Sequence, residues 1–306
     1  MYAPRSTVSS KIQPSELDAM SEPYPWHGEV LLAIAQRLQQ GALPAAIGLS
    51  AAEGWGGRAL LSAATLLLLE LPADKDPEEL AHPDFRWVAP EGAAIKIDQI
   101  RALNAFAVQT SQIAPRKVVA VLDAHLMNVN AANTLLKTLE EPPPNTHILL
   151  CTPYWNRLLP TIRSRCQSYQ VQAGVGQAEA WLQQQAVPFS PQRFAQAGYA
   201  PLTMRDQFAE LDVDAWINKV ATASQFGELV NDAIETGAPL LLAAWYRVLI
   251  QQQSKQPNRV LLAFAEELID TRRMIETSNS TNIRLALERL FHLWQQVSKR
   301  LPRQAG

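Results

Sequence analysis

Two runs of apolar residues constrain the fold of this chain more than any other feature of its sequence. Lys117–Asp123 (KVVAVLD) and His147–Thr152 (HILLCT) carry apolar residues at consecutive positions, so both faces of an extended segment are apolar. A strand with one solvated face alternates apolar and polar residues, whereas a strand covered on both faces does not. We therefore predict that these two runs are buried strands of a parallel sheet.

Further strand and helix patterns alternate along the same part of the chain. Three more strands are predicted, at Pro44–Ser50, Phe85–Ala89 and Gln167–Val171. Helical periodicity beside the strands predicts four helices, at Glu29–Gln39, Arg58–Glu70, Asp98–Ser111 and Ala131–Glu140. Alternation of strands and helices over this length predicts a doubly wound α/β domain.

After Gln172 the strand patterns end, and the remaining chain is predicted to be helical. Short helices with a break near Pro188–Pro191 are expected in Val175–Met204, and longer ones at Pro239–Gln252 and Arg259–Glu276. A last helix is predicted from seven apolar residues that share one face: Ile283, Leu287, Leu290, Phe291, Trp294, Val297 and Leu301. The sequence thus predicts a leader at residues 1–20, an α/β domain at 21–172, a small helical lid at 173–211 and an all-α domain at 212–306.

Composition and charge narrow the classes of protein to which this chain can belong. Its 27 Lys and Arg residues nearly balance 29 Asp and Glu residues, so the net charge is −2. Such a chain lacks the basic excess that holds DNA through its phosphates, although a stand-alone DNA-binding protein stays open as an alternative. Hydrophobic residues make up 47% and supply a sizeable core.

Cysteine usage and hydropathy indicate the compartment. The two cysteines, Cys151 and Cys166, cannot build a disulfide framework or a Cys-rich zinc site, which indicates a reducing, cytoplasmic environment. The first twenty residues lack the apolar segment of a signal peptide, so we expect a disordered leader there. The longest apolar run, near Ala59–Leu69, is too short to span a membrane.

A glycine-rich loop directly follows the first predicted strand, where a phosphate-binding loop would lie. Its residues are Glu53-Gly54-Trp55-Gly56-Gly57-Arg58. A functional loop ends in Gly-Lys-Ser/Thr, because the ammonium group neutralises phosphates and the hydroxyl group ligates Mg²⁺. Gly57 stands at the Lys position and Arg58 at the hydroxyl position, so the loop is either a degenerate phosphate loop or an ordinary β–α turn.

Two motifs and the distance between them decide which family the sequence resembles. The first is Asn133–Pro143 (NTLLKTLEEPP) and the second is Leu158–Cys166 (LLPTIRSRC). With these motifs the chain resembles the bacterial clamp-loader family of AAA+ proteins, and within it the delta-prime branch. The resemblance implies an AAA+ α/β core, a helical lid and a C-terminal collar domain that joins subunits into a ring.

The resemblance also locates residues that in active members handle ATP. The Walker B motif falls at Leu122-Asp123, with Leu122 in place of the Asp that positions Mg²⁺ and Asp123 in place of the catalytic Glu. As an alternative, Asp123 is a helix cap or turn former. The sensor-1 position is Thr152, which we interpret as a relic. Two independent losses, in the loop and in Walker B, imply that this chain has no intrinsic ATPase activity.

Arg165 is the residue to which the resemblance assigns a catalytic role. In clamp loaders the Ser-Arg-Cys motif, here Ser164-Arg165-Cys166, supplies an arginine finger to ATP bound by the neighbouring subunit. A guanidinium group can meet phosphate oxygens bidentately and stabilise the charge that develops in phosphoryl transfer. The alternative is a structural arginine that caps the helix near Thr161–Ser164. Cys166 is expected to be a buried thiol rather than a nucleophile.

The resemblance implies a function and a set of partners. We expect a non-hydrolysing delta-prime subunit of the clamp loader of the DNA polymerase III holoenzyme, acting on ATP–Mg held by a neighbour. The implied partners are the gamma/tau motor subunits, the delta subunit, the sliding clamp and primed DNA. No zinc is expected, because Leu71–Phe85, where many relatives insert a four-cysteine module, contains no cysteine. An active ATPase motor subunit of a clamp loader is the main alternative.

Overall fold

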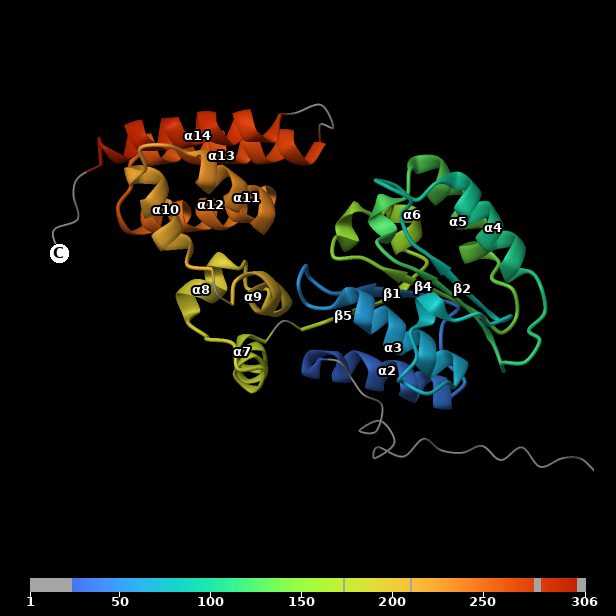
Figure 1. The fold of residues 1–306 in the computed structure, drawn as a ribbon. Helices are drawn as coiled ribbons and strands as arrows, with labels where there is room; N and C mark the ends of the chain where they lie inside the picture. The colour runs from blue at the N-terminus through green and yellow to red at the C-terminus, as the bar shows by residue number, and fades with distance from the viewer. Residues whose placement is uncertain (1–23, 173, 210, 278–281, 302–306) are drawn as a thin grey trace, which may run out of the picture. The chain divides into compact units, whose positions relative to one another are not determined.

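A computed structural model describes residues 24–172, 174–209, 211–277 and 282–301, and Figure 1 shows its helices and strands. The predicted leader, residues 1–20, lies outside the described residues. The chain divides after Gln177 into two compact units. The further division of the helical part near Asp212 stays a prediction.

The first unit is built on one parallel sheet. Its strands are β1 (Ala46–Ser50), β2 (Phe85–Val88), β3 (Lys117–Val121), β4 (Thr146–Cys151) and β5 (Gln167–Gln170). They lie in the order β2-β3-β4-β1-β5, and each neighbouring pair is parallel. The five predicted strands and the doubly wound α/β architecture are confirmed.

Helices cover both faces of the sheet. In chain order they are η1 (Pro25–His27), α2 (Gly28–Gln39), α3 (Gly57–Leu69), η2 (Pro77–Glu79), α4 (Ile97–Ala107), η3 (Ala124–Leu126), α5 (Val129–Glu140), η4 (Trp155–Arg157) and α6 (Pro160–Arg163). Figure 1 shows α2 and α3 on one side of the sheet and α4, α5 and α6 on the other. The strands therefore have no solvated face at the centre of the sheet, which is why β3 is buried at all five positions.

Strand periodicity sends alternate side chains to the two helical layers. Ala46, Val119 and Ile148 join α4, α5 and α6 in one buried cluster, whereas their strand neighbours Ile47 and Val118 point to the other face and are also fully buried. The two cores share the sheet as a common wall. This arrangement fixes the register of the strands, because a slip by one residue would exchange the two sets of side chains.

The predicted helix Asp98–Ser111 is wrong at its C-terminal end, because α4 ends at Ala107. Backbone N–H groups beyond this point donate to a buried carboxylate instead of continuing the helix. Asp84 Oδ1 accepts from Gln112 N at 2.7 Å, and its Oδ2 accepts from the N–H groups of Ile113 and Ala114 at 2.7 and 2.8 Å. Burial by itself raises the pKa of Asp84, but these three donors outweigh it, so the pKa lies below its usual range.

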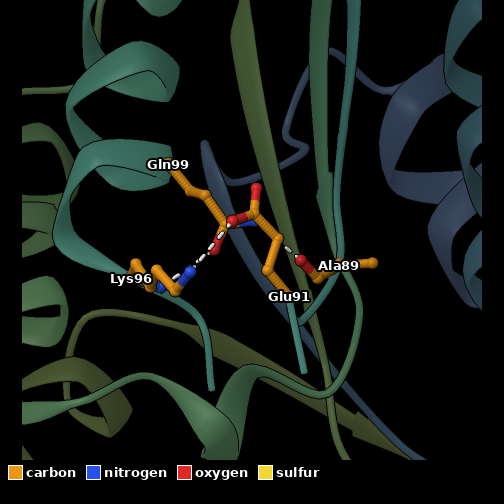
Figure 2. A network of polar contacts seen from close by, with 4 residues as sticks. All are labelled: Ala89, Glu91, Lys96 and Gln99. Atoms are coloured by element: carbon orange, nitrogen blue, oxygen red, sulfur yellow. Dashed lines mark hydrogen bonds and ion pairs between the residues drawn. The ribbon is translucent and has the colours of Figure 1, made fainter. Parts of the chain in front are cut away.

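A second polar network fastens the loop between β2 and α4 (Figure 2). The Gln99 amide donates to Ala89 O and accepts from Lys96 N, both at 2.8 Å. Lys96 also forms an ion pair with Glu91 at 3.4 Å, which is exposed and adds little to stability. The side chain of Gln99 thus ties the start of α4 to the carboxyl end of β2.

The second unit is helical. It contains the rest of α7 (Val175–Gln184) and then α8 (Pro191–Gln196), α9 (Pro201–Gln207), α10 (Val213–Thr222), α11 (Gly227–Thr236), α12 (Ala238–Lys255), α13 (Arg259–Thr277) and α14 (Ile283–Ser298). Aromatic side chains from α10, α12, α13 and α14 meet in its core: Trp216, Trp245, Phe264, Phe291 and Trp294. Five of the seven apolar residues that predicted the last helix are buried there.

Among the described residues, no single helix is both long and apolar enough to cross a membrane. The pair α11 and α12, bent by 100° between them, meets the requirement by combined length and composition.

Candidate functional site

Three loops of the first unit meet where nucleotides bind in open α/β sheets. The residues that end β1, β3 and β4 lead into Ala51–Gly56, Leu122–Asp123 and Thr152, which carry the predicted phosphate loop, Walker B and sensor-1 positions. Because the strands are parallel, their carboxyl ends share one edge of the sheet. The fold therefore brings these predicted positions together.

Residues in and directly before η1 contact the glycine-rich loop. Trp55 is buried, and its carbonyl oxygen accepts hydrogen bonds from Trp26 Nε1 and His27 Nε2, both at 2.9 Å. The Tyr24 ring covers Gly56, since a Cβ added at Gly56 would lie 2.6 Å from two of its ring carbons. Gly56 also has a φ of +78°, which favours glycine. We call Tyr24, Trp26, His27 and Trp55 the aromatic lock.

Three side chains of the aromatic lock, Trp26, His27 and Trp55, are buried, and Tyr24 is half-buried. Tyr24 and Trp26 stack with ring centroids 5.3 Å apart, and Trp26 meets Trp55 edge to face at 5.1 Å. Burial lowers the pKa of His27 to about 4, although the hydrogen bond to Trp55 acts in the opposite direction. His27 is therefore neutral near pH 7, and its Nε2–H donates to the Trp55 carbonyl.

Gly57 and Arg58, which replace the Lys and the hydroxyl residue of a functional loop, also have contacts within the chain. Gly57 O accepts a hydrogen bond from the Cys151 thiol at 3.2 Å, and a Cβ at Gly57 would lie 3.3 Å from that sulfur. Burial raises the pKa of Cys151 to about 12, so the group stays a thiol. Arg58 turns away from the loop, where it pairs with Glu78 and lies 5.6 Å from the Trp87 ring.

The Walker B positions form a tight turn. Leu122 N donates to Val88 O at 2.9 Å, which continues the pairing of β3 with β2. Asp123 has a φ of +50°, and its carbonyl accepts from Leu126 N at 2.8 Å, so the predicted strand Lys117–Asp123 ends at Val121. The backbone of Asp123 acts as a turn former before η3.

The sensor-1 position belongs to a network that sequence reasoning missed. Thr152 is fully buried and accepts from Tyr154 N at 3.0 Å, and its Oγ1 lies 2.9 Å from His125 Nδ1. Burial lowers the pKa of His125, Arg157 adds to the effect, and Asp123 and Glu53 oppose it. The Thr152 hydroxyl and the His125 ring are thus within hydrogen-bonding distance of each other.

The network extends to the glycine-rich loop. The Tyr154 hydroxyl donates to the Glu53 carboxylate, and the Tyr154 ring packs edge to face against His125 with centroids 5.0 Å apart. The Arg157 guanidinium lies 4.0 Å above the Tyr154 ring. A pocket of about 420 Å³ beside these residues is lined by η4 and β5 and not by the glycine-rich loop.

These residues do not fit the phosphates of ATP and their Mg²⁺ ion. The fit would need a cation at Gly57, a hydroxyl at Arg58 and a carboxylate at Leu122, and all three are replaced. The loop that would surround the phosphates packs against the aromatic lock instead. Within the parts of the chain that the structure describes, no group of three or more His, Cys, Asp or Glu residues is arranged to hold a metal ion.

Arg165 lies away from these loops and has partners within the chain. Its Nη1 donates to Thr161 O at 2.9 Å and to Ser164 Oγ at 3.4 Å, and its Nη2 forms an ion pair with Glu140 Oε1 at 2.6 Å. The Thr161 contact is the helix-capping contact that we kept as an alternative to the finger. About a third of the Arg165 side chain is still exposed. Burial raises the pKa of Cys166 to about 12, which leaves a protonated thiol packed against the core.

Topology separates Arg165 from the glycine-rich loop of its own chain. Arg165 precedes β5, so it lies at the amino end of that strand, whereas the loop follows the carboxyl end of the parallel strand β1. Four residues of strand span roughly 13 Å. Arg165 and the glycine-rich loop therefore lie at opposite ends of the parallel strands.

Sequence comparisons show which known proteins this chain is similar to. A family model described as DNA polymerase III, delta subunit matches residues 28–174. The DNA polymerase III subunit delta-prime of Pseudomonas aeruginosa is 39% identical over 200 residues, which are 60% of this chain and 61% of that protein. Over the matched residues this chain is similar to the delta-prime subunits of DNA polymerase III. The Haemophilus influenzae subunit delta-prime is 34% identical over 163 residues.

The match to the delta-prime relatives is partial in length. This chain spans about three fifths of the Pseudomonas protein and about half of the Haemophilus one. A solved structure, the DNA polymerase III gamma subunit-related protein of Thermotoga maritima, aligns over 89% of this chain and 99% of its own with a TM-score of 0.55. At 18% identity that likeness shows the fold alone.

The aromatic lock, the His125–Thr152 pair and the ion pair with Glu140 were missed by sequence reasoning. One signal pointed to the lock, because Tyr24-Pro25-Trp26-His27 gathers three ring side chains just before the first helix. The other contacts join residues distant in sequence, so no local pattern marks them.

Proposed function

We propose that this chain is a non-hydrolysing subunit of the clamp loader of DNA polymerase III and contributes Arg165 to ATP hydrolysis in a neighbouring subunit. The single observation that carries the first half is the glycine-rich loop, which the chain fills with its own aromatic lock. Similarity to delta-prime subunits of DNA polymerase III supports the assignment to this complex.

The position of Arg165 supports action in trans. It lies at the opposite edge of the sheet from the loop of its own chain, so a nucleotide that it reaches belongs to another chain. The planar guanidinium would neutralise charge that develops on the transferred phosphoryl group. ATP and Mg²⁺ would be held by the neighbour and not by this chain.

The proposed partners follow from this role. They are the gamma/tau motor subunits, the delta subunit, and, through the complex, the sliding clamp and primed DNA. The helical unit would form the collar, a proposal supported by apolar side chains exposed on its last two helices, among them Leu262, Ile269 and Leu285. The near-neutral charge fits a subunit that acts on DNA through its partners.

The test is Arg165→Ala in a reconstituted clamp loader. We expect an intact complex, shown by co-elution of all subunits, with ATP turnover lowered at least about tenfold, because removing a finger in well-studied GTPases lowers the rate by about 10³–10⁵. Unchanged turnover in an intact complex would exclude the finger. Mg²⁺-dependent binding and turnover of a fluorescent ATP analogue by the isolated chain would favour the active motor subunit instead.

A further inference from the structure

Arg165 is held within its own chain from two directions. Its Nη1 donates to the last turn of α6, at Thr161 O, and to the Ser164 hydroxyl. Its Nη2 meets Glu140 at the end of a different helix, α5, at 2.6 Å. Both terminal nitrogens of the guanidinium therefore have partners within the chain, while 34% of the side chain stays exposed.

Glu140 stands on a rigid base. It is the last residue of α5, and its neighbour Leu139 belongs to the same buried cluster as Ile162 of α6 and Leu158. The helix that carries the carboxylate and the helix that precedes Arg165 are thus packed together. The fold, rather than a chance side-chain conformation, places Glu140 beside Arg165.

We propose that Glu140 is a positioning residue for Arg165, an inference that rests on the proposed function of Arg165 as a finger in trans. An arginine side chain has several rotatable bonds, and a moving guanidinium loses much conformational freedom when it meets a phosphate group. The ion pair with Glu140 removes part of that loss before the neighbour's nucleotide arrives. Orientation of this kind raises the rate of the chemical step.

The Glu140 carboxylate also attracts the positive charge of Arg165, which could hold Arg165 back from a phosphate group. The exposure of Glu140 limits this attraction. The Glu140 side chain is 49% exposed, so water screens the attraction and the pair is weak. The terminal phosphate of a nucleotide carries up to two negative charges and would compete with the single charge of Glu140 for the guanidinium. Glu140 therefore orients Arg165 without sequestering its charge.

The test is Glu140→Gln in the reconstituted complex, with Glu141→Gln as the matched control that removes the same charge one residue along. We expect kcat for ATP hydrolysis to fall about three- to tenfold with little change in KM, and the control to match the wild type. In an Arg165→Ala background, Glu140→Gln should have no further effect. An unchanged or higher kcat, or an equal loss in both backgrounds, overturns the positioning role.

The outcomes separate this inference from the proposed function. Turnover that Arg165→Ala lowers and Glu140→Gln leaves unchanged overturns only the positioning role. Turnover that Arg165→Ala does not change overturns the finger and the positioning role together. A second readout is the rotation of the Arg165 guanidinium in the full chain labelled with ¹⁵N-arginine, assigned by the loss of its signals in Arg165→Lys. Glu140→Gln should speed this rotation at least about twofold, and an unchanged rotation contradicts the proposal.

Discussion

The glycine-rich loop and the segment around Arg165 lie in the same unit, and they differ in how far their polar groups are exposed. In the loop, Trp55 is buried among aromatic side chains, and its carbonyl accepts two hydrogen bonds from Trp26 and His27. Arg165 is partly exposed, and its ion pair with Glu140 is screened by water. The Trp55 carbonyl has its partners within the chain, whereas Arg165 keeps a charged group that is partly exposed.

This difference distinguishes a motif whose residues have been replaced, the glycine-rich loop, from a motif whose charged residue is kept, Arg165. Where the sequence departs from the phosphate-loop pattern, as at Gly57, the backbone has a partner within the chain, since Gly57 O accepts from the Cys151 thiol. Where a charged group is kept for use by another molecule, strong internal contacts would hinder it. The three predictions below test this contrast by folding stability, from the largest effect to the smallest.

Trp26→Ala should destabilise the first unit most. It removes a buried indole and one of the two donors to Trp55 O, and Trp→Ala changes in cores cost about 3–5 kcal/mol. Urea unfolding followed by circular dichroism measures the shift of that unit's transition. Leu32→Ala, at a position 42% exposed on α2, is the control and should cost less than about 1 kcal/mol. A loss no larger than the control's would show that the aromatic lock does not stabilise the loop.

His27 should make stability depend on pH. Its folded pKa of about 4 lies below the value of an unfolded histidine, so the unfolded state binds a proton first as the pH falls. Stability is then full above about pH 6.5 and decreases toward pH 4, by roughly 2 kcal/mol between pH 7 and pH 5. His27→Gln keeps an amide donor for Trp55 O and should remove this part of the dependence. Urea titrations of both proteins at pH 7 and pH 5 measure this difference. If both lose the same unfolding free energy between the two pH values, His27 is not the cause of the pH dependence.

Arg165→Ala and Glu140→Gln should barely affect folding. An ion pair exposed to this extent contributes about 0–1 kcal/mol, so each change should shift the unfolding free energy by less than about 1 kcal/mol. The measurement is the same urea titration on the isolated chain. A loss of several kcal/mol would mean that Arg165 is a structural cap of α6, and the contrast with the aromatic lock would disappear.

The sequence determined the strands and the resemblance to delta-prime subunits, because both depend on local patterns. Continuous apolar runs made β3 and β4 recognisable, and Leu158–Cys166 could be matched residue by residue. The replacement of the Lys and hydroxyl positions by Gly57 and Arg58 was likewise visible without any coordinates. The end of α4 was predicted four residues too late, because the group that competes for the following N–H groups, Asp84, is distant in sequence.

Only the tertiary structure decided what the altered loop and Arg165 contact. The partners of Trp55 come from residues 28 and 29 positions earlier, and Glu140 precedes Arg165 by a strand and two helices. Such contacts depend on strand order and helix packing, which place distant residues side by side, and no periodicity in the sequence encodes them. The sequence therefore indicated which positions of the phosphate-loop pattern are replaced, and the fold showed which residues of the chain contact the loop there.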